Sequence, residues 1–201
     1  MENQIHGRMA IHELAPDMHD TPTHFTNEQL ADLLHALDAP FVWGDAHRAP
    51  PIPTDWTALI VALAANREAR LRLSLIPLFL RHASAAQYAK TAAAQLSGDA
   101  LLCLRCYYTA AYFLQQVHRM RLEKIIGSFA PLPDLFSADL GLPTLGAAEA
   151  RLRALAVQHG QLSGRALNWL GTYEHGAQQF MRYLEQKQAW QRSPSTISTR
   201  S

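Results

Sequence analysis

The segment from Asp99 to Ile126 constrains the fold most, because between Leu101 and Leu114 it is apolar on almost every side. Its polar exceptions recur at steps of four and three residues: Arg105, Thr109, Tyr112, Gln116, Arg119 and Glu123. Such steps keep side chains on one line along an α-helix. A helix that is apolar on nearly every other side is buried among several neighbours. The sequence therefore predicts a long buried central helix over about 99–126.

Composition supports an all-α fold in one domain. The chain has 201 residues, of which 48% are hydrophobic and 17% charged, as in a globular protein with a sizeable core. Ala and Leu are abundant, and their side chains favour helices over strands. We expect a single-domain bundle of five or six helices with extended Pro-rich loops. Residues 1–24 are expected to form a flexible leader, 25–190 the helical bundle domain and 191–201 a disordered tail.

Capping signals and helix breakers predict the remaining helices. Thr26 and Gln29 form a capping box before a helix over about 27–38. Thr54 is expected to cap a second helix, which Pro77 should kink or break. Further helices are expected at about 85–96, at 147–159 with an end at Gly160, and at 163–190 with an apolar inward seam. Gly127 should end the central helix, and the following loop, 128–146, carries apolar residues that should pack on the bundle.

Charge is distributed unevenly along the chain. Residues 1–55 contain two basic and nine acidic side chains, whereas 56–126 contain nine basic and three acidic ones. An acidic segment against a basic one indicates internal docking or an acidic partner for the middle of the chain. If the basic side chains of the middle segment converge on one face, they would instead favour binding to the phosphates of nucleic acid. The cations concerned, here called the basic set, are Arg67, Arg70, Arg72, Arg81, Arg105, Arg119, Arg121 and Lys124.

Cys103 and Cys106 form a Cys-x-x-Cys unit inside the predicted central helix. Redox use of such a pair normally places it at the start of a helix beside a strand. A structural zinc site would need about two further ligands from elsewhere in the chain. Core packing is the interpretation we favour, with a metal or redox site as the alternative, and no cofactor is expected.

Other chemical motifs are missing from the sequence. There is no Glu-x-x-His pair for a di-iron bundle, no glycine loop for phosphate and no Gly-x-Ser-x-Gly. The first residues lack the basic flank and apolar core of a signal peptide. No uninterrupted apolar run approaches the length of a membrane span. We expect a cytoplasmic protein without a membrane partner.

One short motif resembles a known family. Arg153-Ala-Leu-Ala-Val-Gln-His159 fits the Arg-x(4–6)-His pattern of HEPN ribonucleases, in which both residues act on RNA, although the residue after the arginine is often polar there and is Ala154 here. The chain thus resembles the all-helical HEPN-type proteins that partner minimal nucleotidyltransferases in bacterial toxin–antitoxin modules. This resemblance covers those seven residues and implies a helical fold.

The function we expect is that of a non-enzymatic helical protein-interaction subunit. Its partner would be another protein, such as the nucleotidyltransferase-like enzyme of a bacterial toxin–antitoxin or defence pair; self-association into a homo-oligomer is a further arrangement. The first alternative is a HEPN-type metal-independent ribonuclease that uses Arg153 and His159. The second is a nucleic-acid-binding helical module that uses the basic set.

Overall fold

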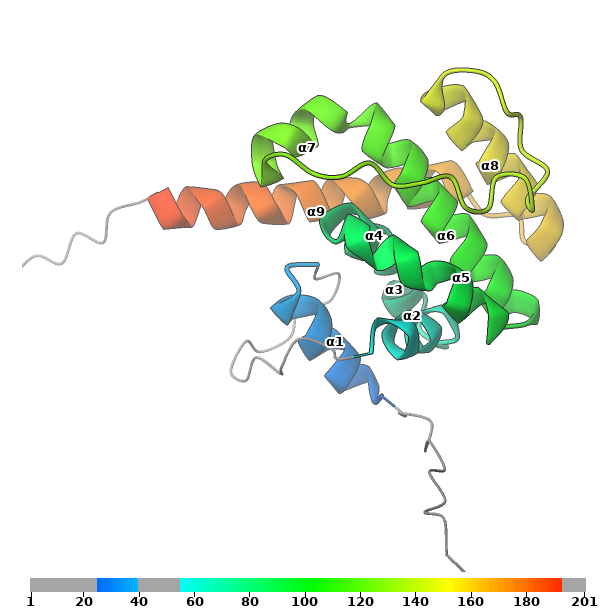
Figure 1. Cartoon of the computed structure of the whole chain (residues 1–201), viewed down its shortest axis with the longest axis horizontal. Helices are drawn as coiled ribbons and strands as arrows, with labels where there is room; N and C mark the ends of the chain where they lie inside the picture. The colour runs from blue at the N-terminus through cyan, green and yellow to red at the C-terminus, as the bar shows by residue number, and fades with distance from the viewer. Residues whose placement is uncertain (1–24, 40–54, 193–201) are drawn as a thin grey trace, which may run out of the picture.

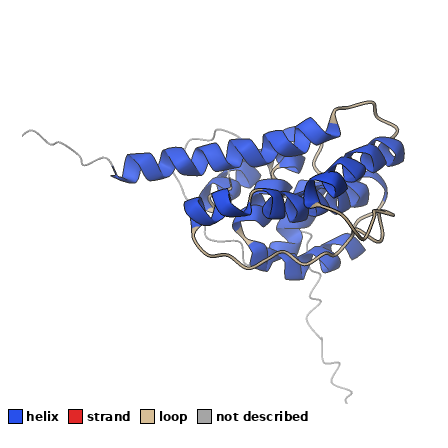
Figure 2. Ribbon diagram, turned by 90° about the horizontal axis from the view of Figure 1, so that it is seen from above, coloured by secondary structure: helices blue, strands red, loops and turns tan. Residues whose placement is uncertain are grey.

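The computed structural model describes residues 25–39 and 55–192, and these residues form helices and loops with no strand among them (Figures 1 and 2). The predicted all-α class is confirmed. The leader 1–24 and the residues from 193 onward lie outside the described ranges. The helices are α1 Asn27–Ala36, α2 Trp56–Ala64, α3 Ala69–Leu73, α4 Leu75–Arg81, η1 Ala83–Ala85, α5 Ala86–Ala94, α6 Gly98–Val117, α7 Arg119–Ile126, α8 Ala148–Ser163 and α9 Trp169–Arg192. None of these helices is long and apolar enough to cross a lipid bilayer.

Helix α6 makes contacts with α2, α4, α5, α8 and α9 (Figure 1). Its apolar side chains are accordingly buried, and Leu104, Tyr108, Phe113 and Leu114 are completely enclosed. Burial of side chains of this size contributes roughly 1.5–3 kcal/mol each to folding. The apolar run in the sequence therefore lies in the core.

The expected single helix over 99–126 is wrong at its carboxyl-terminal third. Helix α6 ends at Val117, and His118 has a non-helical backbone (φ −103°, ψ 17°) before α7 begins at Arg119. The residues that follow His118 are too polar to be enclosed as α6 is. The break lets α7 bury Leu122 and Ile125 and keep its charged side chains at the surface. Gly127 ends α7 with φ 77°, as predicted.

The second predicted helix is three helices, α2, α3 and α4, so the described residues hold more helices than the five or six expected. Asp55, not Thr54, caps α2, because its carboxylate accepts a hydrogen bond from the Ala58 N–H at 3.0 Å. Two breaks separate these helices. The polar residues 66–68 lie between α2 and α3, and Ser74 lies between α3 and α4. Pro77 breaks the helix at this second point, as predicted, because it has no N–H to donate to the carbonyl four residues earlier.

The boundaries of α8 and α9 also differ from those expected. Helix α8 continues through Gly160 and ends at Gly164, which has a left-handed φ of 65°. At Gly160 an added Cβ would lie 3.6 Å from the Trp169 ring, an ordinary contact distance, so this position does not require glycine. Helix α9 starts at Trp169 rather than Ser163, and its end extends beyond the other helices (Figures 1 and 2). Its predicted seam is buried at Trp169, Tyr173, Ala177, Phe180 and Leu184.

The loop between α7 and α8 packs on the bundle, as predicted, and buries Leu132, Phe136, Leu140 and Leu142. Two side chains of α6 hold its backbone. Gln115 accepts a hydrogen bond from the Leu132 N–H at 2.8 Å and donates one to the Ala130 carbonyl at 3.2 Å. The Tyr108 hydroxyl donates to the Pro133 carbonyl at 2.9 Å.

Helix α1 is joined to the bundle by polar contacts at its end. The predicted capping box of Thr26 and Gln29 is present at its start. At its end, Nε2 of His82 hydrogen-bonds the Leu37 carbonyl at 2.7 Å. Asp38 forms ion pairs with Arg81, at 3.6 Å, and with Lys187. Asp38 is thus the acidic side chain of α1 and its end that pairs with the basic middle segment, through Arg81.

Candidate functional site: a cationic cavity beside α6

A cavity of about 220 Å³ lies where the ends of α2 and α8 meet the starts of α6 and α9. We call it the cationic cavity. Two arginines, one carboxylate and several polar and aromatic side chains face it. Its lining residues are Ala64, Ala65, Asn66, Arg72, Asp99, Ala100, Leu102, Cys103, Tyr107, His159, Ser163, Arg165 and Trp169.

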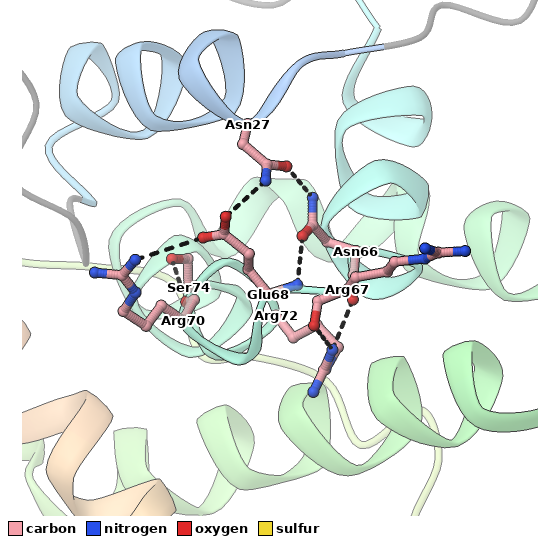
Figure 3. A network of polar contacts seen from close by, with 7 residues as sticks. All are labelled: Asn27, Asn66, Arg67, Glu68, Arg70, Arg72 and Ser74. Atoms are coloured by element: carbon pink, nitrogen blue, oxygen red, sulfur yellow. Dashed lines mark hydrogen bonds and ion pairs between the residues drawn. The ribbon is translucent and has the colours of Figure 1, made fainter.

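Arg72 reaches the cavity from α3 and is held by backbone. Its Nη1 donates to the carbonyls of Asn66, at 2.7 Å, and Arg67, at 2.8 Å, just beyond the end of α2. Figure 3 shows a polar network in which Asn27 of α1 hydrogen-bonds both Asn66 and Glu68. Arg72 lies on the side of this network that is away from α1. Within the part of the chain that the structure describes, Arg72 forms no ion pair, so its charge is not neutralised by a carboxylate.

Arg165 reaches the cavity from the segment between α8 and α9. Its Nη2 lies 3.1 Å from the Asp99 carboxylate, and the two side chains are 52% and 87% exposed. An ion pair this exposed contributes little to stability, because water and salt screen it. Arg165 can therefore exchange Asp99 for another anion at small cost.

His159 is held on two sides. Its ring stacks on Trp169 with 3.6 Å between centroids, and Nδ1 lies 2.6 Å from the Tyr173 hydroxyl. Burial, with a smaller effect of Arg165, lowers the pKa of His159 to about 4, so the ring is neutral at pH 7. The Tyr173 hydroxyl also hydrogen-bonds the Cys106 side chain, and the direction of its bond with Nδ1 depends on the imidazole tautomer.

Cys103 lies at the cavity wall and Cys106 is fully buried, and both are free thiols. Burial raises the pKa of each to about 12, so neither supplies the thiolate that disulfide exchange requires at neutral pH. No cluster of three metal-ligating side chains occurs among residues 25–39 and 55–192. Burial also raises the pKa of Tyr107, which keeps its hydroxyl protonated.

The structure does not bring Arg153 and His159 together. Both lie on α8, but Arg153 is exposed whereas His159 is only 4% exposed and faces the cavity. Two side chains six residues apart in an α-helix point in directions about 120° apart around its axis. Arg153 does not line the cavity.

The basic set is largely occupied by carboxylates of the same chain. Arg70, Arg81, Arg105, Arg119 and Arg121 pair with Glu68, Asp38, Asp139, Glu123 and Glu185 respectively. Arg72 lines the cationic cavity, and Arg67 and Lys124 are exposed. These side chains come from the segment before α3 and from α3, α4, α6 and α7. Phosphates of nucleic acid would compete with these five carboxylates, and the pairs of Arg70 and Arg119, which are 67% and 72% exposed, are the easiest to exchange.

A second hollow, the α8–α9 groove, shares Arg165 and Trp169 with the cationic cavity. It is an open groove of about 620 Å³. Small and apolar residues dominate its lining, which consists of Ala156, Val157, Gly160, Gln161, Gly164, Arg165, Ala166, Leu167, Asn168, Trp169 and Leu170. Val157 is 61% and Leu167 58% exposed.

Sequence reasoning identified Arg72 and His159 but missed Asp99, Tyr107, Arg165 and Trp169 as members of one site. They come from α6, α9 and the segment before α9, and no motif or spacing links them. Only the meeting of separate helices places them together. Comparisons of the chain with protein-family models, with curated proteins and with solved structures find no match.

Proposed function

We propose that this chain is a non-enzymatic interaction subunit that binds an acidic, apolar segment of another protein in the α8–α9 groove. The observation that carries this proposal is the exposure of Val157 and Leu167 at an open groove lined mainly by small and apolar side chains. Contiguous exposed apolar surface commonly marks a site of protein–protein interaction. Ala156 and Leu170 continue this surface at the groove wall.

The charge around the groove favours an acidic partner. Arg165 is the charged residue of the groove wall, and no carboxylate lines it. Arg153 lies four residues before Val157, hence on the same face of α8, and is exposed. Complementary charge at the rim of an interface steers association and selects the partner.

The partner class we propose is the nucleotidyltransferase-like enzyme of a bacterial toxin–antitoxin or defence pair, on the basis of the resemblance of Arg153–His159 to HEPN-type partner proteins. The chain would act by occluding that enzyme or by holding it as a scaffold. A ribonuclease would instead need Arg153 and His159 to act on one RNA. A nucleic-acid-binding module would need the basic set to be free of its internal carboxylates.

The test is capture of the partner from the native host by the tagged full chain, followed by identification by mass spectrometry. Val157→Asp combined with Leu167→Asp places negative charge in the groove and should abolish capture of an acidic partner. Met120→Asp is the matched control, because Met120 is equally apolar, 86% exposed and on α7. This control should capture the partner as well as the unchanged chain does.

A nucleotidyltransferase captured in this groove-dependent way, and slowed by the added chain, would support the proposal. Equal capture by the groove variant and the control would refute it, as would capture of further copies of this chain alone. RNA cleavage by the purified chain that is lost in both Arg153→Ala and His159→Gln would establish the ribonuclease alternative instead.

A further inference from the structure

We propose that the cationic cavity binds a phosphate group, either as the free ion or as part of a small molecule. This inference does not depend on the proposed interaction in the α8–α9 groove. It rests on two arginines, Arg72 and Arg165, and on two polar ring side chains, Tyr107 and His159, that line one cavity.

The first argument is the charge of the cavity. Arg72 and Arg165 carry two positive charges, and Asp99 is the one carboxylate in the lining. His159 adds no charge, because burial lowers its pKa to about 4. The cavity thus has an excess of one positive charge, which an anion would neutralise. Guanidinium groups bind phosphate oxygens through short, charge-assisted hydrogen bonds.

The second argument is two polar side chains of the wall that can reach a ligand. Within residues 25–39 and 55–192 no group hydrogen-bonds the Tyr107 hydroxyl, and His159 uses Nδ1 for Tyr173. Neither the Tyr107 hydroxyl nor His159 Nε2 is among the atoms of these residues that are both buried and unpaired, so both are accessible to solvent. Both side chains line the cavity, and a ligand there can bond to them.

The arrangement of donors favours phosphate over carboxylate. They come from α3, α6, α8 and the segment before α9, that is, from several sides of the cavity. A phosphate presents oxygens in tetrahedral directions, whereas a carboxylate presents two oxygens in one plane. Asp99 and Ala100 lie in the first turn of α6, whose N-cap Ser97 makes no side-chain cap. The free backbone N–H groups of this turn add to the field that attracts an anion.

The size of the cavity limits the ligand. Its volume of about 220 Å³ is below the range of about 300–1,000 Å³ that is usual for drug-sized ligands. Inorganic phosphate or a compact phosphate monoester fits this limit. A folded macromolecule could place no more than one terminal phosphate there.

The experiment is isothermal titration of the full chain with inorganic phosphate, with glycerol phosphate and with acetate, all at the same ionic strength. Loss of one hydrogen bond to a charged group should weaken phosphate binding by about tenfold or more in Arg165→Gln and in Arg72→Gln. Asp99→Asn should strengthen binding, because it removes the carboxylate that competes for Arg165. Arg119→Gln, a distant and exposed arginine, is the control that should leave binding unchanged.

Tighter binding of glycerol phosphate would identify a small phosphate monoester as the ligand, and tighter binding of inorganic phosphate would identify the free ion. Three results would overturn the proposal. These are the absence of saturable phosphate binding by the unchanged chain, acetate binding as tight as phosphate binding, and phosphate binding that Arg165→Gln and Asp99→Asn leave unaltered. Circular dichroism of each variant would verify that the helices remain folded.

Discussion

Tyr107 and Tyr108 are neighbours on α6, yet their hydroxyl groups lie in opposite situations. The Tyr108 hydroxyl donates to the Pro133 carbonyl of the loop before α8. Gln115, two helical turns further along α6, makes two hydrogen bonds to the backbone of the same loop. The Tyr107 hydroxyl faces the cationic cavity and has no partner in the described part of the chain. Buried polarity that the chain's own backbone satisfies serves folding. Buried polarity that faces a cavity is available for recognition.

The largest expected effect lies on the loop side. Gln115→Leu would leave the buried Leu132 N–H and the Ala130 carbonyl without their partners, and each such group costs about 1–3 kcal/mol. We expect the free energy of unfolding, measured with chemical denaturant, to fall by about 3 kcal/mol. Gln116→Leu is the control, because Gln116 is exposed and bonds only within α6. Equal losses in the two variants would show that the loop contacts contribute nothing.

The next effect, a pH dependence, lies on the cavity side. Unfolded His159 takes up a proton near its ordinary pKa of 6.5, whereas in the folded chain burial lowers this pKa to about 4. The unfolded state therefore binds more protons between these values, and stability is lost as the pH falls from about 6.5 to about 4. We expect His159 to account for about 2 kcal/mol of that loss.

His159→Phe isolates this contribution, since phenylalanine keeps a ring against Trp169 but does not titrate. Denaturant unfolding at several pH values should give a flatter profile for this variant. His82 and His118, whose pKa values burial also lowers, will leave a residual slope in both proteins. Parallel profiles for the variant and the unchanged chain would contradict the prediction.

The smallest effect has the opposite sign. Thr109 on α6 is buried, and its hydroxyl has no partner in the described structure. Thr109→Val keeps the shape of the side chain and removes the unpaired hydroxyl, so we expect the free energy of unfolding to rise by about 1 kcal/mol. Thr172→Val is the control, because the Thr172 hydroxyl donates to the Asn168 carbonyl at 2.9 Å. A loss of stability at position 109 would mean that its hydroxyl is bonded in solution.

The parts of the fold that the sequence predicted are those determined by residues close together in the sequence. The capping box at Thr26 and Gln29, the helix end at Gly127 and the buried seam of α9 each follow from residues within a few turns. The break at His118 was missed because the polar stripe keeps helical spacing across it. The site could not be predicted as a unit, since Arg72 and Arg165 are distant in sequence and meet only because α3 and α8 end at the same place.

Two side chains, Arg165 and Trp169, line both the cationic cavity and the α8–α9 groove, and a different occupant is expected in each hollow. A ligand that repositions either side chain therefore alters both hollows at once. Thermodynamic linkage requires the resulting coupling to be equal in the two directions, so an anion that strengthened protein binding would itself be held more tightly by the complex.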